Sequence, residues 1–130
     1  MSLSFDLEAD ENLTRAEVIK ALKACNVTTL IEDDGEIRGN FPRSEMFFFL
    51  RRRIDEHDLL AEGLPSSITW KVGIRMSFDF VTDKYDECKA ELITFLGHLA
   101  ALTASHFVLS FQYEVIHAIR DEKGLKILNF

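Results

Sequence analysis

The chain has 130 residues, of which 47% are apolar and eleven are Phe, and its formal net charge is −7 at pH 7. This length and composition predict one globular domain over residues 1–130 and exclude a disordered chain. The longest apolar runs, such as residues 46–50, are far too short for a membrane-spanning helix. The acidity disfavours nucleic acid and anionic membrane surfaces as partners.

The N-terminus and the two cysteines predict the compartment. The first residues lack a basic stretch followed by an apolar core, so we expect no secretory signal. Cys25 and Cys88 are expected to be buried thiols in a reducing compartment rather than a disulfide. A cytoplasmic protein is the resulting prediction.

The first quarter of the chain is predicted to form a short strand and a helix. Apolar residues alternate over residues 3–7, which favours a strand. The helix is expected from Thr14 to about Cys25, because Thr14 followed three residues later by Glu17 is the pattern of a capping box. Asn26 suits the left-handed conformation that ends many helices.

Three strands and a loop are expected next. Asp33-Asp34-Gly35 is a strong hairpin signal between strands at residues 27–32 and 36–41. After the break at Pro42, residues 45–52 are expected to form a strand with apolar side chains on both faces. The charged stretch over residues 53–65 is predicted to be a loop.

Residues 68–80 carry the clearest pattern in the sequence, because every even position is apolar and every odd position is small, polar or charged. This period of two predicts one long central strand with a buried and a wet face. Gly73 lies within it, where we expect a bend or a bulge.

A second helix is expected to begin at a cap formed by Thr82 or Asp83. Its apolar stripe has helical spacing and consists of Tyr85, Cys88, Leu92, Phe95, Leu99 and Leu102. Its outward side is expected to include Lys84, Glu87, Lys89 and Glu91. Further strands are predicted over residues 106–116 and 125–130, joined by a turn at Gly124.

This order of elements predicts the α+β class. We expect a mainly antiparallel sheet with two helices on one face, in a ferredoxin-like layout with added strands. The other face of the sheet would then be left to water or to a partner.

The sequence contains no recognisable catalytic or cofactor signature. The four histidines lack a metal-ligand spacing, and neither a nucleophile elbow nor a glycine-rich phosphate loop occurs. We therefore expect no enzyme activity, no cofactor and no metal. Three groups of acidic residues stand out instead. Only the group at the start of the second helix has a structural explanation, since its negative charges interact favourably with the helix dipole.

Three stretches, residues 39–49, 70–73 and 107–114, resemble small bacterial immunity proteins that neutralise a cognate polymorphic toxin. The resemblance implies a stoichiometric inhibitor whose partner is a toxin domain, plausibly a basic nuclease. Opposite charges would then steer the two proteins together. The arginine cluster at residues 51–53 fits an acidic inhibitor poorly.

We therefore hypothesise a binding module whose working surface is acidic, with exposed aromatics as anchors. The candidate partner-binding residues are Glu32, Asp33, Asp34, Glu36, Phe47, Phe49, Asp55, Glu56 and Asp58. Two alternatives stay open from the residues alone. One is a small enzyme or ligand binder with a pocket between helices and sheet, and the other is a structural homo-oligomer, for example a homodimer.

Overall fold

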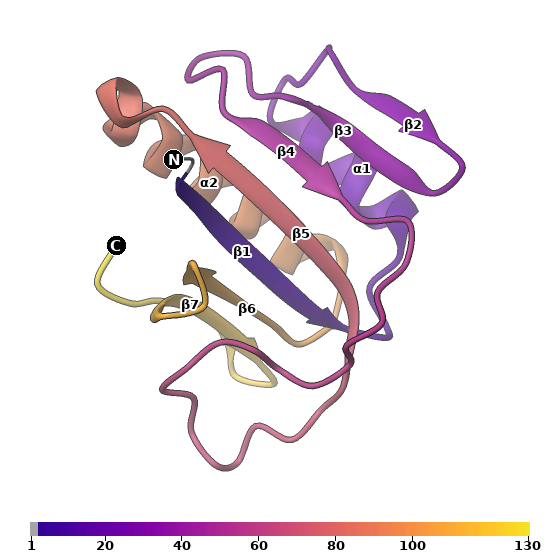
Figure 1. Ribbon diagram of the computed structural model, residues 1–130, viewed down its shortest axis with the longest axis vertical. Helices are drawn as coiled ribbons and strands as arrows, with labels where there is room; N and C mark the ends of the chain where they lie inside the picture. The colour runs from indigo at the N-terminus through magenta and orange to yellow at the C-terminus, as the bar shows by residue number, and fades with distance from the viewer. Residues whose placement is uncertain (1–2) are drawn as a thin grey trace.

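The computed structural model describes residues 3–130, and its strands form one eight-stranded antiparallel sheet (Figure 1). The elements are β1 (Leu3–Asp10), α1 (Arg15–Ala24), β2 (Ile31–Asp33), β3 (Glu36–Asn40), β4 (Phe47–Leu50), β5 (Val72–Phe80), α2 (Tyr85–Leu102), β6 (Phe107–Phe111), β7 (Val115–Asp121) and β8 (Gly124–Ile127). The strand order is β2-β3-β4-β5-β1-β6-β7-β8. Both helices lie behind the sheet in Figure 1, which confirms the α+β class with its helices on one face.

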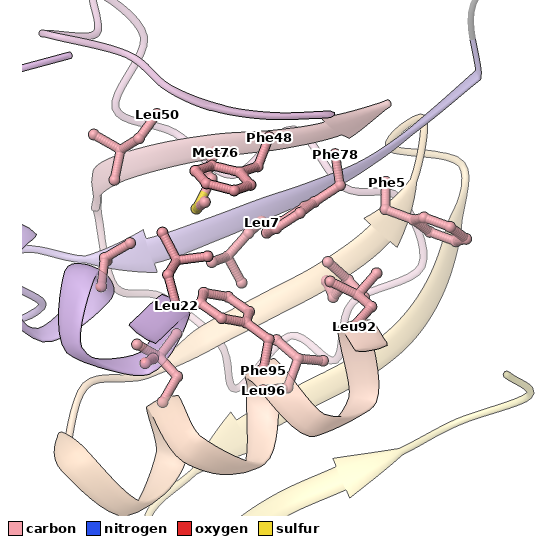
Figure 2. Close-up of a cluster of buried hydrophobic side chains, with 14 of the residues drawn as sticks. Phe5, Leu7, Leu22, Phe48, Leu50, Met76, Phe78, Leu92, Phe95 and Leu96 are labelled. Carbon is pink, nitrogen blue, oxygen red and sulfur yellow. The ribbon is translucent and has the colours of Figure 1, made fainter. Parts of the chain in front are cut away.

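The core lies between the sheet and the two helices. The central strand β1 turns Phe5 and Leu7 toward the helices, and both are buried. Figure 2 shows these side chains beside Phe78 of β5, with Phe95 of α2 facing them from the helix layer. One continuous apolar core therefore joins both helices to the middle of the sheet.

Strand β5 has the predicted alternation but is shorter than expected. Ile74, Met76 and Phe78 are buried on the helix side. The bulge is confirmed, because Ala9 pairs with Ile74 while Asp10 pairs with Val72, which leaves Gly73 without a partner. A Cβ at Gly73 would lie 2.7 Å from the Cα of Glu11, so the close approach of the two backbones requires glycine.

The start of α1 follows its prediction. The Thr14 side chain accepts a hydrogen bond from the Glu17 N–H, and the Glu17 carboxylate accepts one from the Thr14 N–H, so the capping box forms. Asn26 has a φ of 64°, the left-handed conformation expected after the helix.

The start and outward side of α2 differ from the prediction. A single 3₁₀ turn over Thr82–Lys84 precedes the helix, and no side chain caps it. Glu91 is buried rather than exposed, because its carboxylate accepts the backbone N–H groups of Arg43 and Ser44 at 3.0 and 2.9 Å. Glu91 thus fixes the turn that leads into β4.

The strand expected over residues 106–116 is broken by a hairpin turn. Strands β6 and β7 are joined at Gln112 and Tyr113, whose φ angles are 49° and 66°. Both residues adopt the left-handed conformation without being Gly or Asn, so no local residue pattern indicates a turn there.

Candidate functional site

The face of the sheet that points away from the helices, here called the outer face, carries a continuous row of side chains. Residues paired directly across neighbouring strands share a face of the sheet. The register of the strands therefore sets one row from β2 to β7, which consists of Ile31, Arg38, Phe49, Ser77, Asp6, Ser110 and Ile116. This row is apolar at both ends and polar at its centre.

A second row runs beside it and adds an aromatic side chain. It consists of Asn40, Phe47, Asp79 and Ser4. Phe47 and Phe49, here called the aromatic pair, have ring centroids 6.5 Å apart, and both are half-buried. The aromatic pair thus stands on the outer face next to the polar centre of the rows.

The loop between β4 and β5, residues 51–71, covers another part of the outer face, and a buried ion pair holds it there. Glu8 and Arg75, here called the loop anchor, are 0% and 3% exposed, with Arg75 Nη2 2.9 Å from Glu8 Oε2. The Glu8 carboxylate also accepts the N–H groups of Leu60 and Ala61, at 2.9 and 3.0 Å.

Arg75, the cation of the loop anchor, also binds the loop directly. Its guanidinium donates to the carbonyl oxygen of Asp58 at 2.5 Å and to that of Glu56. The expected exposure of Arg75 is therefore wrong: the register is as predicted, but the loop closes over this side chain. Because both charges are paired and hydrogen-bonded, they can be buried without an unpaired ion.

Two carboxylates in the uncovered rows lack such a cation. Asp6 is 8% exposed, and its only side-chain partner among the described residues is the Ser4 hydroxyl, which donates to it at 3.2 Å. Burial raises the pKa of Asp6, and the charges of Glu8 and Asp79 raise it further, while Ser4 and Arg51 lower it. Burial also raises the pKa of Asp79. Within residues 3–130, neither carboxylate forms an ion pair.

Two groups from the β6–β7 hairpin border these carboxylates. Ser110 lies directly opposite Asp6, and its hydroxyl is buried without a hydrogen-bond partner. Burial raises the pKa of Tyr113, and the charges of Asp6 and Glu8 raise it further, while those of Arg75 and Arg51 lower it, so the phenol lies near Asp6 and the loop anchor. The polar centre of the outer face is thus a desolvated acidic site.

The predicted hairpin carboxylates lie at the β2 edge of the sheet, and arginines partly neutralise them. Glu36 pairs with Arg38 at 2.6 Å, and Asp34 lies 3.5 Å from Arg52. Glu32 and Asp33 are exposed, and Asp33 pairs with Glu36 in the strand register. Of the arginine cluster at residues 51–53, Arg52 therefore lies beside the acidic hairpin.

The predicted loop carboxylates have local partners. Asp58 pairs with Lys71, and this contact lowers the pKa of Asp58. The Glu56 carboxylate accepts the Asp58 N–H at 2.8 Å, and Asp55 is exposed. These three residues belong to the covering loop, whereas the aromatic pair lies on the sheet itself.

Surface hollows of about 270 to 480 Å³ bear on a small-molecule site. One of about 270 Å³ is lined by Trp70, His106 and Glu122 among others, which is smaller than most ligand pockets. Another of about 370 Å³ lies beside Cys25 and Glu91. Burial, with the Glu91 charge, raises the pKa of Cys25 to about 11, so the thiol is protonated at neutral pH and a poor nucleophile.

No family model, no curated protein and no solved structure matches the chain. The ferredoxin-like layout and the resemblance to immunity proteins therefore stay predictions. Among the described residues, no group of three or more His, Cys, Asp or Glu side chains is placed to hold a metal ion. No helix in residues 3–130 is long and apolar enough to cross a membrane.

Sequence reasoning missed Asp6 and Asp79. Asp79 was one of the polar residues of the alternating strand, and the strand predicted over residues 3–7 would have placed Asp6 on its polar face. What could have singled them out is that they are diagonal neighbours on β1 and β5, which only the register supplies.

Proposed function

We propose that this protein is a non-catalytic binding module that neutralises a cationic protein toxin, as an immunity protein does, and that it binds through its outer face. One observation carries the proposal: the half-buried aromatic pair stands on the uncovered outer face beside carboxylates that have no cation. Aromatic side chains dominate the binding energy of interfaces, whereas charges set the association rate and specificity.

Charge complementarity favours a cationic partner. The net charge is −7, and the outer face carries the exposed Asp33 and the half-buried Asp79, with the buried Asp6 beside Asp79. A basic toxin domain would pair these carboxylates while covering the two rings. A cytoplasmic location suits this role, because the inhibitor would meet its toxin before export.

The test is a binding measurement with the purified toxin domain encoded beside this gene. Phe49→Ala should weaken binding by roughly 30-fold, which is the size of an aromatic hot spot. Leu102→Ala, at a 42%-exposed apolar residue at the end of α2 on the helix side, is the matched control and should bind as the parent does. Equal binding by both folded variants would exclude the outer face.

A second copy of the chain is the alternative occupant of the outer face. Sedimentation at micromolar concentration distinguishes the two. A monomer that forms a one-to-one complex with the toxin supports the proposal, and a dimer that Phe49→Ala dissociates overturns it in favour of self-association.

A further inference from the structure

The polar centre of the outer face contains partly buried charge that this chain does not neutralise. Asp6 and Asp79, here called the carboxylate pair, are diagonal neighbours on adjacent strands, because Asp6 pairs with Ser77 and Asp79 with Ser4. Such neighbours lie about 7 to 8 Å apart.

A second feature at the same place indicates a missing partner. The Ser110 hydroxyl is 0% exposed, lies directly opposite Asp6 and has no hydrogen-bond partner, which is the only such case among the buried side chains described. Leaving a buried hydroxyl unpaired is unfavourable, because it has lost its hydrogen bonds to water. A donor that entered beside Asp6 would relieve the unpaired hydroxyl and the unpaired carboxylate together.

We propose that the carboxylate pair is a recognition site for an arginine side chain of the partner, with the Ser110 hydroxyl as an added acceptor. A guanidinium presents five donors in one plane and can bridge two carboxylates, whereas an ammonium is a compact point charge. Phe47, directly opposite Asp79, supplies a ring on which the guanidinium plane can stack. This inference rests on the proposed function, since it names the side chain that the outer face binds.

One cation of this chain already acts on the site from a distance. Arg51, an exposed residue just after β4, lowers the pKa of Asp6 without forming an ion pair with it. Other charges that act on Asp6 are Glu8 and Asp79, and Glu8 is neutralised by Arg75. Arg51 therefore competes weakly with an incoming arginine for the same carboxylate.

The test uses the full chain and two synthetic probes, a hexa-arginine and a hexa-lysine peptide, at low ionic strength. Carboxyl carbon resonances report where each peptide binds. We expect the arginine peptide to shift the Asp6 and Asp79 resonances first and to bind more tightly than the lysine peptide. Uniform shifts across the acidic residues, or equal affinity for both peptides, would overturn the inference.

Matched variants sharpen this experiment. Asp79→Asn, at a partly exposed position that tolerates the change, should weaken the arginine peptide by about tenfold, which is the size of a charge-assisted hydrogen bond. Asp86→Asn removes the same charge from the exposed start of α2 and should have little effect. Arg51→Gln should strengthen binding by about twofold, and Arg53→Gln should not. Equal losses in the two aspartate variants would contradict a specific site.

The outcome separates this inference from the proposed function. If the toxin domain binds the parent and Asp79→Asn equally well, the arginine site is wrong and the binding module stands. If the arginine peptide binds at the carboxylate pair but the toxin domain is not bound, the site stands and the proposed function fails.

Discussion

Single residues on the outer face carry an electrostatic cost. The native-state pKa of Asp6 is raised above its usual value of 3.8, mainly by burial. The native state therefore binds a proton more tightly than the unfolded state, and stability falls as the pH rises through the interval between the two pKa values. Above that interval, at neutral pH, the cost is present in full.

Asp6→Asn should remove this cost. We expect the variant to melt at a higher temperature than the parent at about pH 7 and to lose this advantage at about pH 3, where Asp6 is protonated in both states. Thermal melts at both pH values measure the difference. Asp33→Asn, at an exposed position, is the control for removing one negative charge. A lower melting temperature for Asp6→Asn at neutral pH would mean that Asp6 stabilises the fold.

In the core, one ring joins the helix layer to the sheet. Phe95 is fully buried, with its ring centroid 5.6 Å from that of Phe78 and 6.2 Å from that of Phe41. Phe95→Ala should lower the free energy of unfolding by about 3 to 5 kcal/mol, because it removes these contacts and leaves a cavity. Urea unfolding measures the loss, and a change below about 1 kcal/mol would contradict this packing.

At the scale of elements, the loop anchor decides whether residues 51–71 stay on the sheet. Glu8→Ala leaves the buried Arg75 without its counter-charge and frees the N–H groups of Leu60 and Ala61. We expect a loss of about 3 to 5 kcal/mol in unfolding free energy and faster proteolysis within the loop. The double variant Glu8→Ala/Arg75→Ala should lose less than the sum of the single variants.

The control for this experiment is an ion pair of the same loop that solvent reaches. Asp58→Ala breaks the exposed pair with Lys71 and should leave the unfolding midpoint nearly unchanged. Equal proteolysis of Glu8→Ala and Asp58→Ala would mean that the buried pair does not hold the loop.

Glu91 connects helix α2 to the turn before β4 and also acts on Cys25. Glu91→Gln removes a charge that raises the pKa of Cys25 and weakens the acceptors of the Arg43 and Ser44 N–H groups. We expect a loss of about 1 to 3 kcal/mol in stability and faster reaction of Cys25 with a disulfide reagent. Glu87→Gln, exposed on the same helix, should change neither quantity.

A feature of the fold could be predicted where its signal lies in residues that are close together in the sequence. The capping box of Thr14, the turn at Asp34 and Gly35, and the bulge at Gly73 follow from short-range rules and were found from the sequence. The β6–β7 turn was missed, because Gln112 and Tyr113 adopt left-handed backbones that their residue types disfavour. Tertiary contacts evidently hold that turn, including the hydrogen bond from the Glu62 N–H to the Tyr113 carbonyl oxygen at 2.7 Å.

The candidate site was less predictable than the fold for a similar reason. The alternation of apolar and polar residues predicted that Asp6, Arg75 and Asp79 lie on the polar faces of their strands. Whether each would meet water, a loop or an opposite charge depends on which strands are neighbours and on where residues 51–71 lie. Neither the strand order nor the position of this loop can be predicted from neighbouring residues. Arg75 was therefore expected to be exposed, but it is buried.

At the scale of the whole molecule, charge should govern the rate of capture. The double reversal Asp33→Lys/Asp34→Lys should slow association with the cationic toxin domain and flatten its salt dependence, with little change in melting temperature. Stopped-flow measurements at several salt concentrations provide the rates. Asp86→Lys/Glu87→Lys at the exposed start of α2 changes the net charge by the same amount and is the control. An equal effect of both double reversals would mean that net charge alone explains the result.

The central position of β1 has a consequence for how the protein is made. This strand leaves the ribosome first, but its partners are β5 and β6, and β6 ends only at Phe111. The middle of the sheet therefore cannot close until most of the chain has been synthesised. Such long-range pairing predicts folding in milliseconds to seconds rather than microseconds. Until then β1 lacks at least one of its two neighbouring strands, and the nascent chain is most prone to aggregate in that interval.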